Sequence, residues 1–169
     1  VVDGNIANFD AVSEAVHKCW RRLGTSTKFV AMSLPTAAVI TKKIILPANL
    51  RETEMEVQVE SEANQYIPFA LDEVNLDFQV LGAVPSSPEE VEVLIAASRK
   101  EKVEDRVACA EAAELKPLVM DVESFAVQAA FELVRKQVPA KGKDQIVALV
   151  DIGAVATKVG VSVTVKTCE

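Results

Sequence analysis

The sequence predicts an α/β fold with one sizeable core and an inserted segment of different character. The chain has 169 residues, half of them hydrophobic, which is enough for one domain carrying a smaller insertion and excludes a disordered chain. Strand-like and helix-like stretches alternate in residues 93–169, which is typical of a parallel sheet with right-handed crossovers. Between about residues 36 and 92, strands with one polar face and a charged helix lie between prolines, which indicates a separate insert.

A helix and a buried strand are expected at the beginning of the chain. Asp10 is the expected N-cap of the helix, and Gly24 is its expected C-terminal stop. The run from Lys28 to Leu34, ended by Pro35, predicts a buried strand. Apolar residues at helical spacing predict which side of the helix faces the core: Val12, Val16, Cys19 and Leu23.

The insert is predicted to contain three strands and one helix. Residues 38–46 alternate apolar and polar side chains, as a strand with one exposed face does. Asn49 followed by Glu52 resembles a capping box for the helix. Residues 76–80 and 91–97 predict two further strands, and the prolines between them indicate a hairpin. The helix is expected to bury side chains at helical spacing: Met55, Val59, Ala63 and Tyr66.

The second half of the chain returns to strands that alternate with helices. Ser98 and Glu101 resemble a capping box for a helix that precedes the strand at residues 117–121. Asp121 is the expected cap of the next helix, and a further strand ends on Asp151. Because ligands bind beyond the carboxyl ends of parallel strands, Asp121 and Asp151 mark the edge where a site is expected.

Composition excludes several classes of partner. A net charge of −7 and a pI near 4.9 argue against nucleic acid and against attachment to anionic lipid. No apolar run approaches the roughly 18 residues that a membrane span needs. The three cysteines are widely spaced, which supports neither a disulfide framework nor a zinc site and fits a reducing cytoplasm. Proteins, or an anion neutralised by a metal, are therefore the expected partners.

The stretch from Ile146 to Val163 contains the main candidate site. It predicts a strand, a tight turn and a second strand, with Asp151 ending the first strand and Gly153 in the turn. Peptide N–H groups freed from ladder pairing there could form a nest for a phosphate, and Asp151 could hold the Mg²⁺ of a nucleotide. An ordinary hairpin with an acid and a glycine at its turn is the alternative.

Glu123 is expected to point across the same crevice toward the Asp151 loop. A carboxylate there could orient an attacking water, or reach Mg²⁺ through a water. Alternatively, Asp121 and Glu123 only satisfy the helix N-terminus and its dipole.

An apolar knot follows the charged helix of the insert. Its side chains either pack in the core or form the lip of a groove that accepts a partner peptide. The knot consists of Tyr66, Ile67, Pro68 and Phe69.

Three stretches carry a family resemblance: EANQYIPFALDEVNLDFQVLG, VMDVESFAVQAAFELV and VALVDIGAVATKVGV. They resemble the PilM family of type IV pilus assembly proteins, which are actin-like relatives of FtsA and MreB. The resemblance covers nearly the whole chain, and QYIPF…VNLDF is its specific part. It implies a fragment of a larger actin-like protein: an RNase H-like subdomain 1A at residues 1–35 and 93–169, with an inserted α+β subdomain 1C at 36–92.

The resemblance also implies functional residues. Asp151 and Gly153 would begin the second phosphate loop of the family, with Ala154 and Thr157 following in it. Glu123 matches the acidic residue that helps to place the hydrolytic water. ATP with Mg²⁺ is the implied cofactor of the complete protein. The first phosphate loop has no match here, so nucleotide binding by this chain alone is expected to be weak or absent.

The implied function is that of a scaffold for pilus assembly and twitching motility. Such a protein is expected in the cytoplasm, where it associates with the inner membrane through the N-terminal cytoplasmic peptide of PilN and with other inner-membrane assembly proteins. The groove between the two subdomains is the expected peptide site. The alternatives are a catalytically active actin-fold ATPase or sugar-kinase-like enzyme, and a binding platform with no nucleotide role.

Overall fold

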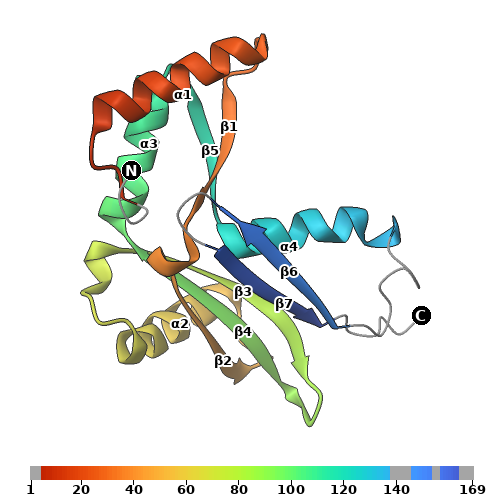
Figure 1. The fold of residues 1–169 in the computed structure, drawn as a ribbon. Helices are drawn as coiled ribbons and strands as arrows, with labels where there is room; N and C mark the ends of the chain where they lie inside the picture. Colours follow the sequence, from red (N-terminus) through yellow and green to blue (C-terminus); the bar gives the residue numbers. More distant parts are fainter. Residues whose placement is uncertain (1–4, 138–145, 154–156, 164–169) are drawn as a thin grey trace.

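Helices and three small sheets form a mixed α/β fold in the computed structural model (Figure 1). The structure describes residues 5–137, 146–153 and 157–163. The helices are α1 (Phe9–Leu23), α2 (Glu52–Tyr66), α3 (Lys100–Ala112) and α4 (Glu123–Val134). The strands are β1 (Phe29–Leu34), β2 (Ile40–Pro47), β3 (Val74–Val84), β4 (Ser87–Arg99), β5 (Lys116–Val122), β6 (Ile146–Ile152) and β7 (Thr157–Val163).

Strands β1 and β5 form a parallel pair that α1 and α3 cover. Val30 and Met32 of β1 pack against the buried cluster Ala110, Ala113 and Leu115 at the end of α3, together with Val16 and Trp20 of α1. The predicted core positions of α1 are therefore only partly right: Val16 packs on the cluster, but Cys19 and Leu23 are exposed, and Ser13 is buried.

The ends of α1 are set by two capping residues, one of which the sequence pattern misses. The Oδ1 atom of Asn8 accepts a hydrogen bond of 2.9 Å from the N–H of Ala11, so Asn8 is the N-cap instead of the expected Asp10. Gly24 ends the helix as predicted, with a φ of 64° that few residues other than glycine adopt readily.

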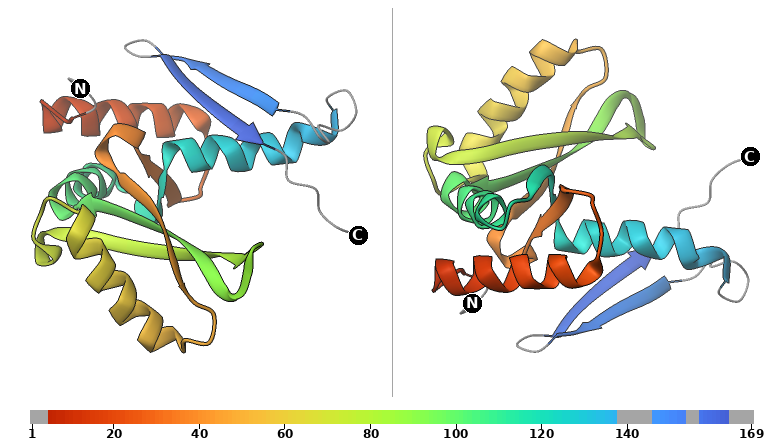
Figure 2. Two further views of the ribbon diagram at one scale, coloured as in Figure 1. Left: turned by 90° about the horizontal axis from the view of Figure 1, so that it is seen from below. Right: turned by 90° about the horizontal axis from the view of Figure 1, so that it is seen from above.

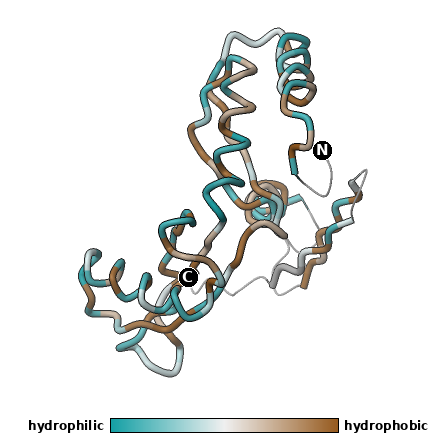
Figure 3. The backbone as a smooth tube through the Cα atoms, turned by 90° about the vertical axis from the view of Figure 1, so that its left-hand side faces the viewer, coloured by the Kyte–Doolittle hydropathy of each residue, from teal (hydrophilic) through white to brown (hydrophobic). Residues whose placement is uncertain are grey.

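Residues 40–99 form a second unit, which we call the small lobe. Its antiparallel sheet has the order β2-β4-β3, and α2 packs on one face (Figures 1 and 2). The helices change from hydrophilic to hydrophobic around each turn, as helices with one buried side do (Figure 3). All buried members of the lobe's core cluster come from the lobe itself: Ile44, Leu46, Met55, Val59, Ala63, Ile67, Val74, Val93, Ile95 and Ala97.

The capping box of α2 lies two residues later in the sequence than the predicted one. Glu54 accepts hydrogen bonds from the backbone N–H of Arg51 at 3.0 Å and from its guanidinium at 2.7 Å. This pair takes the place expected for Asn49 and Glu52.

Two expectations about the sheets differ from the structure. β4 pairs with β2 up to Ala97 and with β3 up to Arg99, so the small sheet continues past the predicted boundary at residue 92, and Ser98 lies in a strand instead of capping a helix. The parallel pairing is limited to β1 and β5 in the described residues, because β6 pairs antiparallel with β7. β7 follows β6 closely in the sequence, so their pairing closes a short loop at little entropic cost, and this local partner satisfies backbone groups of β6.

The β6–β7 hairpin lies alongside α4 (Figures 1 and 2). Val147 and Leu149 are half-buried, whereas Ile146, Val150 and Ile152 on the other face are exposed. Asp151 shares the more buried face with Val147 and Leu149, because side chains alternate along a strand.

Candidate functional site

The beginning of α4 and the hairpin bring three charged side chains together. Lys158 of β7 lies directly opposite Asp151 of β6 in the antiparallel ladder. Its ammonium donates a hydrogen bond to Oε1 of Glu123, and Nζ lies 3.9 Å from Oδ2 of Asp151. Glu123 and Asp151, two predicted site residues 28 positions apart in the sequence, therefore approach the same cation.

The charges of this triad do not balance. Two carboxylates face one ammonium, and Oε2 of Glu123 is buried without a hydrogen-bond partner among the described residues. A buried carboxylate oxygen is stabilised by a donor, so this atom can accept one more hydrogen bond. Glu123 also lies in the first turn of α4, where the helix dipole favours a negative charge.

The triad does not suit Mg²⁺ as it stands. Mg²⁺ prefers carboxylate oxygens, waters and phosphate oxygens in octahedral geometry, whereas the ammonium of Lys158 already pairs with both carboxylates. Within the described ranges, no group of three or more acidic, histidine or cysteine side chains gathers that could hold a metal ion.

The two strands on either side of the turn lie where the sequence predicts them, and they pair as the hairpin that is the alternative interpretation of this stretch. Ile152 and Thr157 are the last paired residues before the turn, and Gly153 follows β6 at the exposed surface. Thr157 is also exposed at the start of β7. Ala154 lies outside the described residues. The proposed contacts of these residues with phosphate stay a prediction.

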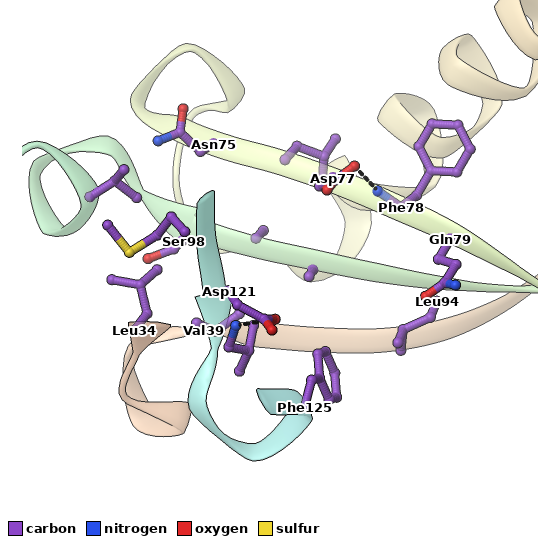
Figure 4. Close-up of a pocket in the computed structure, with 16 residues that line it drawn as sticks. Leu34, Val39, Asn75, Asp77, Phe78, Gln79, Leu94, Ser98, Asp121 and Phe125 are labelled. Carbon is purple, nitrogen blue, oxygen red and sulfur yellow. Dashed lines mark hydrogen bonds between the residues drawn. The ribbon is translucent and has the colours of Figure 1, made fainter. Parts of the chain in front are cut away.

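A cavity of about 400 Å³ lies between the small lobe and the ends of β1 and β5 (Figure 4). The small lobe contributes the sheet face that points away from α2, with Asn75, Asp77 and Gln79 of β3. Across from them lie Asp121 of β5 and Phe125 of α4. The remaining lining residues are mainly apolar: Leu34, Val39, Leu76, Phe78, Leu94, Ala96, Ala97, Ser98, Val103, Met120 and Val122.

The carboxylates in this cavity are held by local backbone contacts. Oδ1 of Asp121 accepts a hydrogen bond of 2.6 Å from the N–H of Val122, and Oδ1 of Asp77 accepts one of 2.9 Å from the N–H of Phe78. Asp121 therefore does not cap α4 as predicted. Neither carboxylate forms an ion pair within the described part of the chain, so both can receive a donor from a ligand.

Hydrogen bonds hold the connections between the small lobe and the rest of the chain. The chain leaves β1 for the small lobe through the short turn Thr36–Ala38 and returns through the end of β4. The buried hydroxyl of Ser98 donates to the carbonyl of Ala38 at 2.8 Å, and the ammonium of Lys100 donates to the carbonyl of Asp72 at 2.7 Å. The first bond joins the two connections to each other, and the second joins the start of α3 to the turn before β3.

The apolar knot does not line this cavity. Ile67 is buried in the core between α2 and the sheet, on the opposite face from the cavity. The Tyr66 ring packs under the ammonium of Lys42 at 4.7 Å, and the Phe69 ring packs under the guanidinium of Arg99 at 5.5 Å. The structure thus gives the knot a packing role, and a separate role in binding a partner stays untested.

A larger cavity, of about 630 Å³, lies between α1, β1 and α3. Its walls are mostly apolar, with Trp20, Phe29 and Met32 among them. None of the predicted site residues lines it.

Two features of the site could not be found from sequence patterns alone. Lys158 reaches Asp151 only because of the hairpin register, and no motif marks that lysine. The cavity depends on the placement of the small lobe against β5, although Asp121 was already a candidate as a residue at a strand end. In the described part of the chain, no helix is both long and apolar enough to cross a membrane.

Comparison with known proteins gives a consistent result. The family model described as type IV pilus assembly protein PilM matches residues 1–167. The structure is similar to that of a PilM-PilN type IV pilus biogenesis complex, with 31% sequence identity and a TM-score of 0.78 over 95% of this chain. It shares the fold, at 13% identity and a TM-score of 0.51 over 68% of this chain, with the cytoplasmic domain of EpsL, an inner-membrane component of the type II secretion system of Vibrio cholerae. This chain spans 47% and 44% of the lengths of those two chains. It belongs to the PilM family of type IV pilus assembly proteins.

Proposed function

We propose that this chain is the part of a pilus-assembly scaffold that binds the N-terminal cytoplasmic peptide of PilN. The observation that carries the proposal is the cavity between the small lobe and β5. Its volume of about 400 Å³ falls in the range of ligand-binding pockets. The similar solved structure is described as a complex of PilM with PilN, which supports a peptide of that partner as the ligand.

The lining of the cavity suits an extended peptide with apolar side chains. Leu94, Met120 and Phe125 offer apolar contact area, and the amide side chains of Asn75 and Gln79 can pair with the backbone groups of a peptide. β3 pairs with β4 alone in the described residues, so its other edge can also accept backbone hydrogen bonds.

Binding of this peptide would bring the scaffold to the inner membrane from the cytoplasm, beside other inner-membrane assembly proteins. In the complete protein, we propose that the turn after Asp151 contacts the phosphates of ATP. The position of Gly153 supports this part, because it is exposed directly after the last paired residue of β6, where a phosphate could approach the backbone.

An ATPase or sugar-kinase-like activity has less support. Glu123 is the expected catalytic carboxylate, but its Oε1 already accepts a hydrogen bond from Lys158, which leaves only the buried Oε2 to orient a water. A scaffold role requires no such water.

Calorimetric titration with a synthetic PilN N-terminal peptide tests the proposal. Replacing Phe125 by alanine should weaken binding by about 10- to 100-fold, because buried aromatic anchors contribute about 1–3 kcal/mol. Phe69→Ala is the matched control, since Phe69 is also a partly exposed aromatic but lies away from the cavity. The proposal fails if the folded wild-type chain gives no heat of binding, or if Phe69→Ala weakens binding more than Phe125→Ala.

A further inference from the structure

We infer that Lys158 is a built-in cation that occupies the place between Glu123 and Asp151 where a divalent metal ion would otherwise bind. The inference deepens the nucleotide part of the proposed function and is independent of the peptide cavity. It says that Mg²⁺ is excluded from the carboxylate pair as long as Lys158 stays between the two side chains.

The hairpin register delivers the lysine to this place. Lys158 and Asp151 are directly opposite each other in the ladder, and residues opposite each other project to the same face of a sheet. That face is the one turned toward α4, where Glu123 lies in the first helical turn. Both ends of the lysine are thus fixed: its backbone by the ladder, and its ammonium by Glu123.

Electrostatics then disfavours a second cation. A divalent ion between Glu123 and Asp151 would lie within a few ångströms of the ammonium, and like charges at that separation repel strongly in a partly desolvated place. Lys158 would have to leave both carboxylates before the metal could bind.

Manganese is a suitable probe, because its paramagnetism broadens the NMR signals of nearby amides and reports binding without any activity. In the wild-type chain, Mn²⁺ should leave the NMR signals of the amides around Glu123 and Asp151 unbroadened, at Mn²⁺ concentrations that broaden the same signals in a variant without the lysine. Lys158→Gln removes the cation and keeps a side chain of similar length. It should raise the affinity for Mn²⁺ at this place by about tenfold or more, the size of effect that a neighbouring charge has on an ionic equilibrium.

Three further variants make the result specific. Lys158→Arg keeps the charge and should stay free of metal, and Lys158→Gln combined with Asp151→Asn should lose the gained affinity. Lys18→Gln is the matched control, because Lys18 pairs at 2.7 Å with the single carboxylate of Glu14 on α1 and leaves no carboxylate pair behind.

Two results would overturn the inference. One is broadening around Glu123 and Asp151 in the wild-type chain at the same Mn²⁺ concentration as in Lys158→Gln. The other is a Lys158→Gln variant that keeps the amide spectrum of the folded hairpin and gains no affinity for Mn²⁺. Peptide titration distinguishes this failure from a failure of the proposed function, because the cavity contains neither Lys158 nor Asp151.

Discussion

Two valines in α2 test whether the small lobe has a core of its own. Val59 is 1% exposed and packs between α2 and the sheet, whereas Val57, two residues earlier in the same helix, is 64% exposed. Replacing each by alanine makes the same chemical change in the same helix, so only the burial differs.

The expected difference follows from that burial. Val59→Ala removes two buried methyl groups, which lowers the free energy of unfolding by about 1.6 kcal/mol at about 0.8 kcal/mol each. The cavity left behind brings the loss to about 2–3 kcal/mol. Alanine favours a helix over valine by up to about 0.6 kcal/mol at both positions. Val59→Ala should therefore lose about 1.5–2.5 kcal/mol, and Val57→Ala should be neutral or slightly more stable.

Urea denaturation followed by circular dichroism measures both variants. The loss in Val59→Ala corresponds to a decrease in melting temperature of about 4–8 °C for a chain of this size. The fluorescence of Trp20, the single tryptophan, reports separately on the part formed by α1 and β1. Equal stabilities of the two valine variants would refute the assignment of Val59 to the core of the lobe.

Three other predictions concern single contacts. Asn8→Ala should cost about 1 kcal/mol of stability through loss of the N-cap, which is more than Asp10→Ala should cost in the first turn. Thermal denaturation measures both variants. A larger loss in Asp10→Ala would mean that Asp10 is the cap. The hydrogen bond from Arg51 holds the pKa of Glu54 below its ordinary value of 4.5, so this pair stabilises the fold above about pH 4.5 and loses its effect as the pH falls through the lowered value. An NMR pH titration should show the pKa of Glu54 rising in Arg51→Gln, and an unchanged pKa would contradict the cause. Ser98→Ala should cost about 1 kcal/mol in urea denaturation, because it leaves a carbonyl at the junction of the lobe without its donor, and no loss would mean that the bond does not hold the two connections.

Local patterns predict much of this fold. The helical spacing of Met55, Val59 and Ala63 correctly identifies the buried side of α2, because burial of one helix face repeats with the turn of the helix. The fourth predicted position fails: Tyr66 is 44% exposed, and Ile67 enters the core where the helix ends and the direction of the side chains changes.

Non-local arrangement is harder to derive from the sequence. Ser98 has the pattern of a capping residue, yet β4 extends through it because pairing with β3, which continues to Arg99, satisfies its backbone groups. Strand periodicity also could not show that β6 pairs with β7 instead of β5, since both partners fit an apolar strand. Glu123 and Asp151 were predicted to converge, and they do, but the lysine between them depends on a register that the sequence does not specify.

The most direct test of the central proposal is to map the PilN peptide on this chain by NMR. A spin label at the end of the peptide should broaden the amides of β3 around Asp77 and those at the start of α4 around Phe125, on the two sides of the cavity. Broadening around the knot from Tyr66 to Phe69, with the cavity amides unaffected, would contradict the account.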